Sequence, residues 1–134
     1  PAGIVMLDVD DFKIYNDTFG HDFGDRVLKM IVEHIKNSLR NQDKLIRYGG
    51  DEFIIYLPNI EIEDFYLIMQ NILENIHHAT IRRYESVQFS LSAGITMYQT
   101  GTIEEAVSLA DHLLYHAKSK KELHIYRIRS SVLF

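Results

Sequence analysis

The sequence contains no cysteine, only two prolines and no long hydrophobic run. The lack of cysteine excludes disulfides, thiolate nucleophiles and cysteine-ligated zinc sites, and it fits a reducing compartment. The longest apolar runs, such as 4–7, are far shorter than the ~20 residues that a membrane-spanning helix needs. We therefore expect a cytoplasmic location and no membrane contact for this part of the chain, while the full-length protein could still carry a membrane anchor.

Basic residues are also in short supply, because 19 Asp and Glu outnumber 14 Lys and Arg and give a net charge of −5. A protein that coats nucleic acid needs an excess of bases, so nucleic acid is not an expected partner. The acids are clustered, since segment 8–25 holds six aspartates against the single base Lys13. With 134 residues, 46% of them hydrophobic, the chain is expected to form one globular domain.

Hydrophobic periodicity predicts alternating strands and helices. The apolar run 4–7 is typical of a strand buried on both faces, and a short helix is expected to begin near 11–13. Further helices are predicted over 25–39, 62–77 and 103–120, and further strands over 44–48, 53–57, 87–97 and 124–128. We expect Gly49 and Gly50 to close a hairpin, because glycine accepts positive φ. The order of elements indicates an α/β sandwich with one sheet and packed helices.

Two acidic clusters lie at predicted strand or turn ends. Asp8 and Asp10 follow the first strand, and strand periodicity places them on one face with Val9 turned away. Asp51 and Glu52 adjoin the glycine turn. If the hairpin pairs beside the first strand, Asp8 and Asp51 come close together, and two like charges 4 Å apart cost about 4 kcal/mol at an effective dielectric constant of 20. A cation would remove this cost, and oxygen ligands suit Mg²⁺.

This pattern indicates phosphoryl or nucleotidyl transfer, with one metal ion or two ions about 3.5–4 Å apart. Solvated loop carboxylates are the ordinary alternative. Phosphatases with an aspartyl nucleophile also carry Asp-x-Asp after a strand, but they are longer and have a small hydroxyl or β-branched residue after the second Asp. No Walker-type phosphate loop occurs, so phosphates would meet the backbone N–H groups of 11–13 and the side chain of Lys13.

Two longer motifs are more specific. Residues 8–25 run DVDDFKIYNDTFGHDFGD and residues 47–53 run RYGGDEF, and together they resemble the GGDEF family of diguanylate cyclases. Segments 92–95 and 110–118 also resemble later family segments, so the likeness covers nearly the whole chain. It implies a mixed, mainly antiparallel sheet of about five strands flanked by helices, as in nucleotidyl cyclase and polymerase palm domains. It also implies one GGDEF domain over 1–134, which we expect to lack an N-terminal helix and a sensory region that precede it in a longer protein.

The resemblance further implies an activity and a set of metal ligands. Two GTP molecules, one on each of two facing domains of a homodimer, would be joined into cyclic di-GMP with release of two pyrophosphates. Mg²⁺ or Mn²⁺, two ions per active site, would be bound by Asp8, the Val9 carbonyl and Asp51. Asp51 would also help to deprotonate the ribose 3′-hydroxyl, while Glu52 would assist and Lys13 would balance phosphate charge.

The implied nucleotide site draws on five further residues. They are Phe12, Asn16, His21, Asp25 and Lys118. Asn16 and Asp25 would recognise guanine, because a carboxylate accepts from both N1–H and the 2-amino group, whereas helix capping and turn formation are their alternative roles. Lys118 would contact the triphosphate.

Arg40 and Asp43 resemble the family's Arg-x-x-Asp inhibitory site, at which dimeric product binds. Arg40 suits bidentate phosphate contact, and Asp43 suits a guanine edge. The alternative is an i, i+3 ion pair near a helix end, which is worth about 0.2–0.5 kcal/mol.

One position departs from the family pattern. Glu122 replaces the arginine that usually follows Lys118 on the triphosphate, and a carboxylate there would repel phosphate unless Lys120 or Lys121 compensates. This departure favours an alternative function, a catalytically weak module that binds GTP or cyclic di-GMP and relays a signal.

His112 and His116 lie four positions apart on the predicted last helix. This spacing can bind zinc. No third ligand lies near them in the sequence, so a solvated helix face is the ordinary interpretation.

Overall fold

A five-stranded sheet forms the centre of the computed structural model, which describes residues 1–119 and 127–130. Its strands are β1 (Ala2–Val9), β2 (Lys44–Arg47), β3 (Glu52–Pro58), β4 (Leu91–Tyr98) and β5 (Arg127–Ser130). They lie in the order β2-β3-β1-β4-β5. The first four pair antiparallel, and β5 joins β4 in parallel. The mixed, mainly antiparallel sheet implied by the sequence is thus confirmed.

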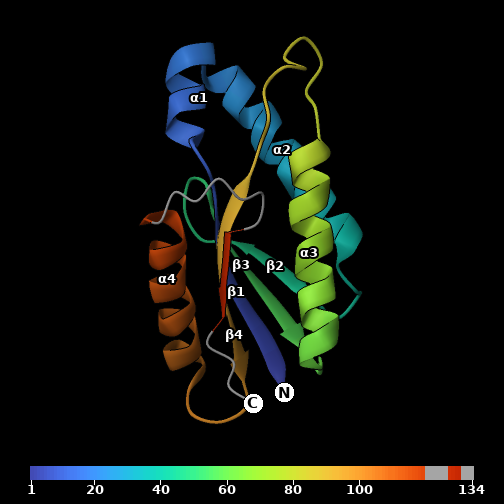
Figure 1. Ribbon diagram of the computed structural model, residues 1–134, viewed down its shortest axis with the longest axis vertical. Helices are drawn as coiled ribbons and strands as arrows, with labels where there is room; N and C mark the ends of the chain where they lie inside the picture. The colour runs from blue at the N-terminus through green and yellow to red at the C-terminus, as the bar shows by residue number, and fades with distance from the viewer. Residues whose placement is uncertain (120–126, 131–134) are drawn as a thin grey trace.

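In the described part of the chain, four helices pack around this sheet (Figure 1). They are α1 (Phe12–Phe19), α2 (His21–Ser38), α3 (Ile62–His78) and α4 (Ile103–Ser119). Helices α2 and α3 pack on one face of the sheet, and α4 lies on the other. Within the described part of the chain, no helix has both the length and the apolar character needed to cross a membrane.

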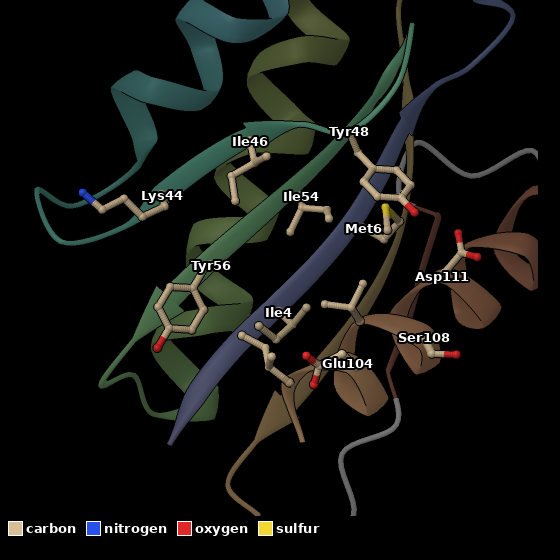
Figure 2. A pocket seen from close by; sticks show the side chains of 12 residues that line it. Ile4, Met6, Lys44, Ile46, Tyr48, Ile54, Tyr56, Glu104, Ser108 and Asp111 are labelled. Carbon is tan, nitrogen blue, oxygen red and sulfur yellow. The ribbon is translucent and has the colours of Figure 1, made fainter. Parts of the chain in front are cut away.

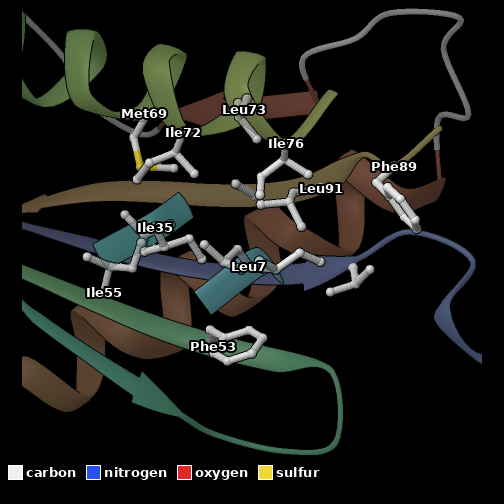
Figure 3. Close-up of a cluster of buried hydrophobic side chains, with 14 of the residues drawn as sticks. Leu7, Ile35, Phe53, Ile55, Met69, Ile72, Leu73, Ile76, Phe89 and Leu91 are labelled. Atoms are coloured by element: carbon white, nitrogen blue, oxygen red, sulfur yellow. The ribbon is translucent and has the colours of Figure 1, made fainter. Parts of the chain in front are cut away.

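The two faces of the sheet hold separate apolar clusters, because successive side chains of a strand point to opposite sides. Val5, Leu7 and Val9 belong to the larger cluster under α2 and α3, whereas Ile4 and Met6 belong to the cluster under α4. Figure 3 shows the larger cluster, in which side chains of α3 lie against those of β4. Because β1 is central, it is buried along its whole length, as its continuous apolar run predicts.

Helix α4 covers only part of its face. Beside it an open groove of about 590 Å³ lies between α4 and the strands β1, β3 and β2 (Figure 2). Ile4, Met6 and Ile54 line the groove, and Ile46 and Tyr48 at its hairpin side are 50% and 62% exposed. This face of the sheet therefore presents apolar side chains to its surroundings.

The helix expected over 25–39 begins earlier, at His21. Gly20 takes a φ of 95°, which glycine adopts without strain, and this residue separates α1 from α2. Gly24 lies in the first turns of α2 and not in a loop. A Cβ at this position would lie 1.8 Å from Oδ1 of Asn16, so glycine is needed where α1 and α2 approach each other. Gly24 therefore allows two helices to approach closely, although a glycine at this place in the sequence is also typical of a turn. For this reason the helix was expected to begin too late.

The strand expected over 87–97 begins only at Leu91. The β1–β4 ladder ends with Val9 opposite Leu91, since the chain beyond Val9 turns toward α1, so residues 87–90 belong to no strand pair among the described residues. Phe89 is nevertheless fully buried and packs against Tyr15 and Phe23. In residues 87–90 the alternation of apolar and polar side chains therefore reflects burial and not pairing with β1. At the C-terminal end, 127–130 form β5, and 124–126 of the strand expected there lie outside the described residues.

The hairpin between β2 and β3 forms as expected, but its glycines do not use positive φ. The last ladder pair is Arg47 opposite Phe53, so the connection is longer than the two-residue turn that demands positive φ. Arg47 holds this loop, because its guanidinium donates to the carbonyls of Gly49 at 3.1 Å and Gly50 at 2.6 Å.

Candidate active site

Three carboxylates meet where β1 and the β2–β3 hairpin lie side by side. Asp8 is opposite Glu52 in the β1–β3 ladder, and Asp51 directly precedes β3. One carboxylate oxygen of each of these residues lies within 4.8 Å of the others. The Val9 N–H donates to the Asp51 carbonyl at 3.2 Å, which ties the two acidic motifs together through their backbones. The expected meeting of Asp8 and Asp51 therefore occurs.

Asp8 is the buried member of this cluster, with 4% of its surface exposed. Among the described residues its Oδ1 has no hydrogen-bond partner, while Oδ2 accepts from Nζ of Lys118 on α4. Burial and the neighbouring Asp51 carboxylate raise the pKa of Asp8 to about 7, although Lys118 opposes the shift. Partial burial lowers the pKa of Lys118, but the hydrogen bond and charge of Asp8 outweigh this effect and raise it.

Helix α4 reaches the acidic cluster because β4 contains Gly94. A Cβ at this position would lie 2.1 Å from the Ala110 carbonyl oxygen and 2.4 Å from the Leu114 nitrogen. Only glycine allows the helix backbone to lie so close to the strand. This contact keeps α4 close to β4 and so positions the last turn of α4, from which Lys118 extends to Asp8.

Asp10 has a positioning role that sequence reasoning missed. Its two carboxylate oxygens each accept a hydrogen bond of 2.5 Å, one from the Ser90 hydroxyl and one from the Ser92 hydroxyl. Its N–H also donates to the Ser90 carbonyl at 3.0 Å. Asp10 therefore joins the end of β1 to β4 and fixes the strand end that carries Asp8. The polar positions of the alternating segment 87–97 were the only sequence signal for this contact.

The expected guanine-binding residues gather where α1 meets α2. Asn16 lies against Gly24, the residue that precedes Asp25. His21 and Asp25 are both exposed at the start of α2. The structure thus brings Asn16 and the segment that contains Asp25 together and leaves the latter side chain accessible to a ligand.

Helix α1 carries two other predicted site residues, Phe12 and Lys13, on its first turn. Phe12 is half-buried against the core, and Lys13 is exposed. The helix is fixed by Tyr15, whose hydroxyl donates to the Gln88 carbonyl at 3.0 Å and whose ring packs edge-on against Phe89. Because α1 follows Asp10 after a single residue, Lys13 is tied closely to the end of β1.

Arg40 and Asp43 contact each other away from the carboxylate cluster. Both carboxylate oxygens of Asp43 accept from the Arg40 guanidinium, with the shortest contact at 2.7 Å. The same guanidinium donates to the Pro58 carbonyl at 2.7 Å and to the Asn59 carbonyl at 3.3 Å. This hydrogen bonding raises the pKa of Arg40. The i, i+3 ion pair is therefore present, and it connects the segment before β2 with the end of β3; product binding there stays a prediction.

Three residues of the expected triphosphate region lie outside the described residues. They are Lys120, Lys121 and Glu122. The effect of an acidic residue at the usual arginine position therefore stays a prediction.

The residues at the strand ends fit a divalent cation of the magnesium type. Their donors are carboxylate oxygens, which Mg²⁺ and Mn²⁺ prefer over nitrogen or sulfur. Oδ1 of Asp8 is a buried acceptor with no donor among the residues that the structure describes, as expected of an oxygen that binds a cation. Burial is the main cause of the raised pKa of Asp8, and repulsion by the Asp51 carboxylate adds to it, so a bound cation would favour the ionised form.

An antiparallel sheet of the order β2-β3-β1-β4, with carboxylates on neighbouring strand ends and flanking helices, defines the class as an α+β domain with an acidic strand-end site. The family model described as "Diguanylate cyclase, GGDEF domain" matches residues 1–124. The chain belongs to this family.

Individual relatives agree with this assignment. The chain is 37% identical over 123 residues to "Probable diguanylate cyclase DgcT" of Escherichia coli (strain K12), a match over 88% of this chain and 27% of that protein. It is also 37% identical over 117 residues to diguanylate cyclase DgcP of Pseudomonas aeruginosa, over 86% of this chain and 17% of that protein. The chain thus spans about a quarter or less of these relatives' lengths.

Among solved structures, diguanylate cyclase SiaD of Pseudomonas aeruginosa, in complex with its activator SiaC, superposes with a TM-score of 0.88 at 32% identity. The match covers 97% of this chain and 50% of that chain. The sequence-based assignment to the GGDEF family is thus confirmed, and so is the fold.

Proposed function

We propose that this domain is a diguanylate cyclase that condenses two GTP molecules into cyclic di-GMP and two pyrophosphates. The observation that carries the proposal is the cluster of Asp8, Asp51 and Glu52, whose carboxylate oxygens converge beside Lys118. One domain presents one such cluster, whereas each of the two bonds in the product joins two nucleotides. A homodimer with facing sites is therefore the proposed working form.

The proposed site holds Mg²⁺ or Mn²⁺, two ions per active site, through Asp8, the Val9 carbonyl and Asp51. When bound, such ions lower the pKa of the attacking hydroxyl and offset phosphate charge. Asp51 orients the ribose 3′-hydroxyl and accepts its proton, and Glu52 beside it assists this transfer. Close packing of these carboxylates supports the assignment, because each can reach the same reacting atoms.

Protein cations are proposed to stabilise the negative charge that develops on the phosphates. Lys13 lies on the first turn of α1 and is exposed toward solvent, so its flexible side chain can follow the phosphates. Lys118 bonds Asp8, and it would be free to contact the triphosphate if Asp8 held a divalent cation. Its side chain is 45% exposed, which supports such a movement.

Guanine is proposed to bind between α1 and α2. Asp25 accepts from N1–H and the 2-amino group, and Asn16, which lies against the neighbouring Gly24, contacts the base edge. Phe12 and His21 contribute to the walls of this pocket. Adenine lacks this pair of donors, so replacing Asp25 with alanine should reduce the preference for GTP over ATP.

Cyclic di-GMP is proposed to feed back at Arg40, with Asp43 holding the guanidinium in place. Because Arg40 also has a structural role, Arg40→Lys is the suitable variant, since it keeps the charge and loses the bidentate fork. We expect weaker cyclic di-GMP inhibition with an unchanged rate at low product. An identical inhibition curve in a variant that remains folded by circular dichroism would remove this site from the proposal.

The activity is tested by incubating the full-length protein with GTP and Mg²⁺ and measuring cyclic di-GMP by chromatography. We expect turnover whose rate per molecule falls on dilution, because the working form is a homodimer. Asp51→Asn should abolish turnover and leave the fold intact. Full activity of Asp51→Asn, or the absence of product at high concentration of the wild-type protein, would refute the proposal.

The second candidate function is a catalytically weak module that binds GTP or cyclic di-GMP and relays a signal. It is favoured by Lys118, which bonds Asp8, and by Glu122 at the usual arginine position. The same incubation separates the two candidates, provided that nucleotide binding is measured in parallel by calorimetry. Binding without product would support the module, and replacing Glu122 with arginine should then restore turnover.

A further inference from the structure

The exposed side of α4 carries two histidines whose imidazole nitrogens face each other. Nε2 of His112 and Nε2 of His116 are 3.1 Å apart, and the two rings are nearly perpendicular at 80°. Both residues are exposed, and the buried face of the helix, formed by residues such as Ala110 and Leu114, points the other way. The pair therefore lies outside the carboxylate cluster and has a different donor chemistry.

The distance between the two nitrogens suits a shared metal ion. Zinc lies about 2.0–2.1 Å from an imidazole nitrogen. Two such bonds at a tetrahedral angle would separate the nitrogens by about 3.4 Å, and two bonds at a right angle by about 2.9 Å. The observed 3.1 Å lies between these values, so only small side-chain rotations are needed to bring both lone pairs onto one ion.

The helix supplies this geometry without any rearrangement of the backbone. Residues four apart lie on the same side of a helix, so His112 and His116 are neighbours wherever α4 is formed. The helix itself is anchored by its contact with Gly94 and by the bond from Lys118 to Asp8. A pair held in this way loses little conformational freedom when it binds an ion.

Imidazole nitrogen is a good ligand for copper, nickel and zinc, whereas the carboxylate oxygens at the strand ends suit Mg²⁺ or Mn²⁺. Among the described residues, no third histidine, cysteine, aspartate or glutamate joins the pair in a three-residue cluster. Its other coordination positions would be filled by water, so the site would be reversible and accessible from solvent.

We propose that His112 and His116 form a second, surface metal site for a divalent transition ion of the Zn²⁺, Ni²⁺ or Cu²⁺ class. The ion bridges the last turns of α4, the helix end that carries Lys118. Binding should therefore stabilise this end of the helix. The inference does not rest on the cyclase function, because the pair is separate from the residues that were assigned to catalysis.

The test titrates Cu²⁺, Ni²⁺ and Zn²⁺ into the full-length, untagged protein after removal of trace metals, in excess Mg²⁺ to occupy the carboxylates. We expect one Cu²⁺ site with two nitrogen ligands by electron paramagnetic resonance, an affinity that is highest for Cu²⁺, and a metal-dependent rise in the unfolding midpoint. His112→Gln and His116→Gln should each weaken binding at least tenfold, since even loss of an outer-shell partner costs about 10–100-fold.

Matched variants separate this site from others. His77→Gln removes a histidine from the end of α3, and Asp51→Asn removes a carboxylate from the strand-end cluster; both should leave Cu²⁺ binding unchanged. The double variant Asp111→His with His112→Gln keeps the number of histidines but places the pair five positions apart, and it should bind as weakly as His112→Gln. Unchanged Cu²⁺ affinity in His112→Gln or His116→Gln, or a loss confined to Asp51→Asn, would overturn the proposal and leave the pair as a hydrogen-bonded imidazole contact.

Discussion

We predict that the raised pKa of Asp8 makes divalent metal binding depend on pH in a range where carboxylates usually do not titrate. A metal ion binds the deprotonated carboxylate, so protonation of Asp8 competes with the ion. With a pKa of about 7, about one Asp8 in eleven is deprotonated at pH 6 and about ten in eleven at pH 8. The apparent affinity for Mn²⁺ should therefore rise about tenfold between these values.

Free Mn²⁺ can be followed by electron paramagnetic resonance at constant ionic strength, with nucleotide absent. Calorimetry in two buffers of different ionisation enthalpy should show about half a proton released per ion bound at pH 7. An ordinary carboxyl, with its pKa near 4, would already be fully deprotonated and would give a flat profile. A flat Mn²⁺ affinity between pH 6 and pH 8 would therefore refute the reasoning.

Two variants test the cause of the shift. Asp8→Asn should remove the pH dependence together with most of the affinity. Lys118→Met removes a group that lowers the pKa of Asp8, so the midpoint of the profile should move above pH 7. A midpoint that stays the same in Lys118→Met would show that the ion pair does not act on this carboxyl in solution.

The same shift affects folding stability in the absence of metal. The pKa of Asp8 is raised from 3.8 in the unfolded chain to about 7, so its contribution to stability is complete below pH 4 and is lost as the pH rises through 7. Mn²⁺ should cancel this loss by binding the native form. Urea unfolding at several pH values, with and without the ion, measures both effects.

Three substitutions outside the carboxylate cluster, Gly94→Ala, Ser92→Ala and Asp43→Ala, test the packing that supports the site by urea unfolding, with Gly50→Ala as a control. Gly94→Ala should destabilise the domain by about 1–3 kcal/mol, because α4 must move off β4, whereas Gly50→Ala, with open space around it, should change stability by less than about 0.5 kcal/mol. Ser92→Ala removes a short hydrogen bond to the carboxylate of Asp10 and should cost about 1.5–3 kcal/mol. Asp43→Ala removes the buried partner of an arginine and should cost about 1–3 kcal/mol. Equal stabilities of the two glycine variants, or no loss in either of the other two, would contradict the packing described.

The sequence was sufficient for those parts of the fold that depend on strong periodicity. The apolar run of β1 and the two acidic motifs beside the hairpin predicted that Asp8 and Asp51 would meet, and strand pairing brings them together. Hydrophobic periodicity also placed residues 87–90 in a strand. It could not show that pairing with β1 stops at Val9, because that depends on where the neighbouring strand turns away.

Long-range contacts between polar residues could not be predicted from the sequence. The bond from Lys118 to Asp8 joins residues 110 positions apart, and the bond from Ser92 to Asp10 joins residues 82 positions apart. Neither pair has a local spacing that would indicate contact. The role of Gly94 was hidden in the same way, since only the packed helix shows why a side chain is excluded there.

The central place of β1 has a consequence for how the domain folds. Its partners β3 and β4 are both distant in the sequence, so the strand that carries Asp8 gains its pairing only after large loops have closed. Chains that depend on such non-local pairing fold more slowly than helical ones. We therefore expect the carboxylate cluster to be completed late in folding, so that a partly folded chain would lack a formed metal site. Metal binding would then report the completion of folding.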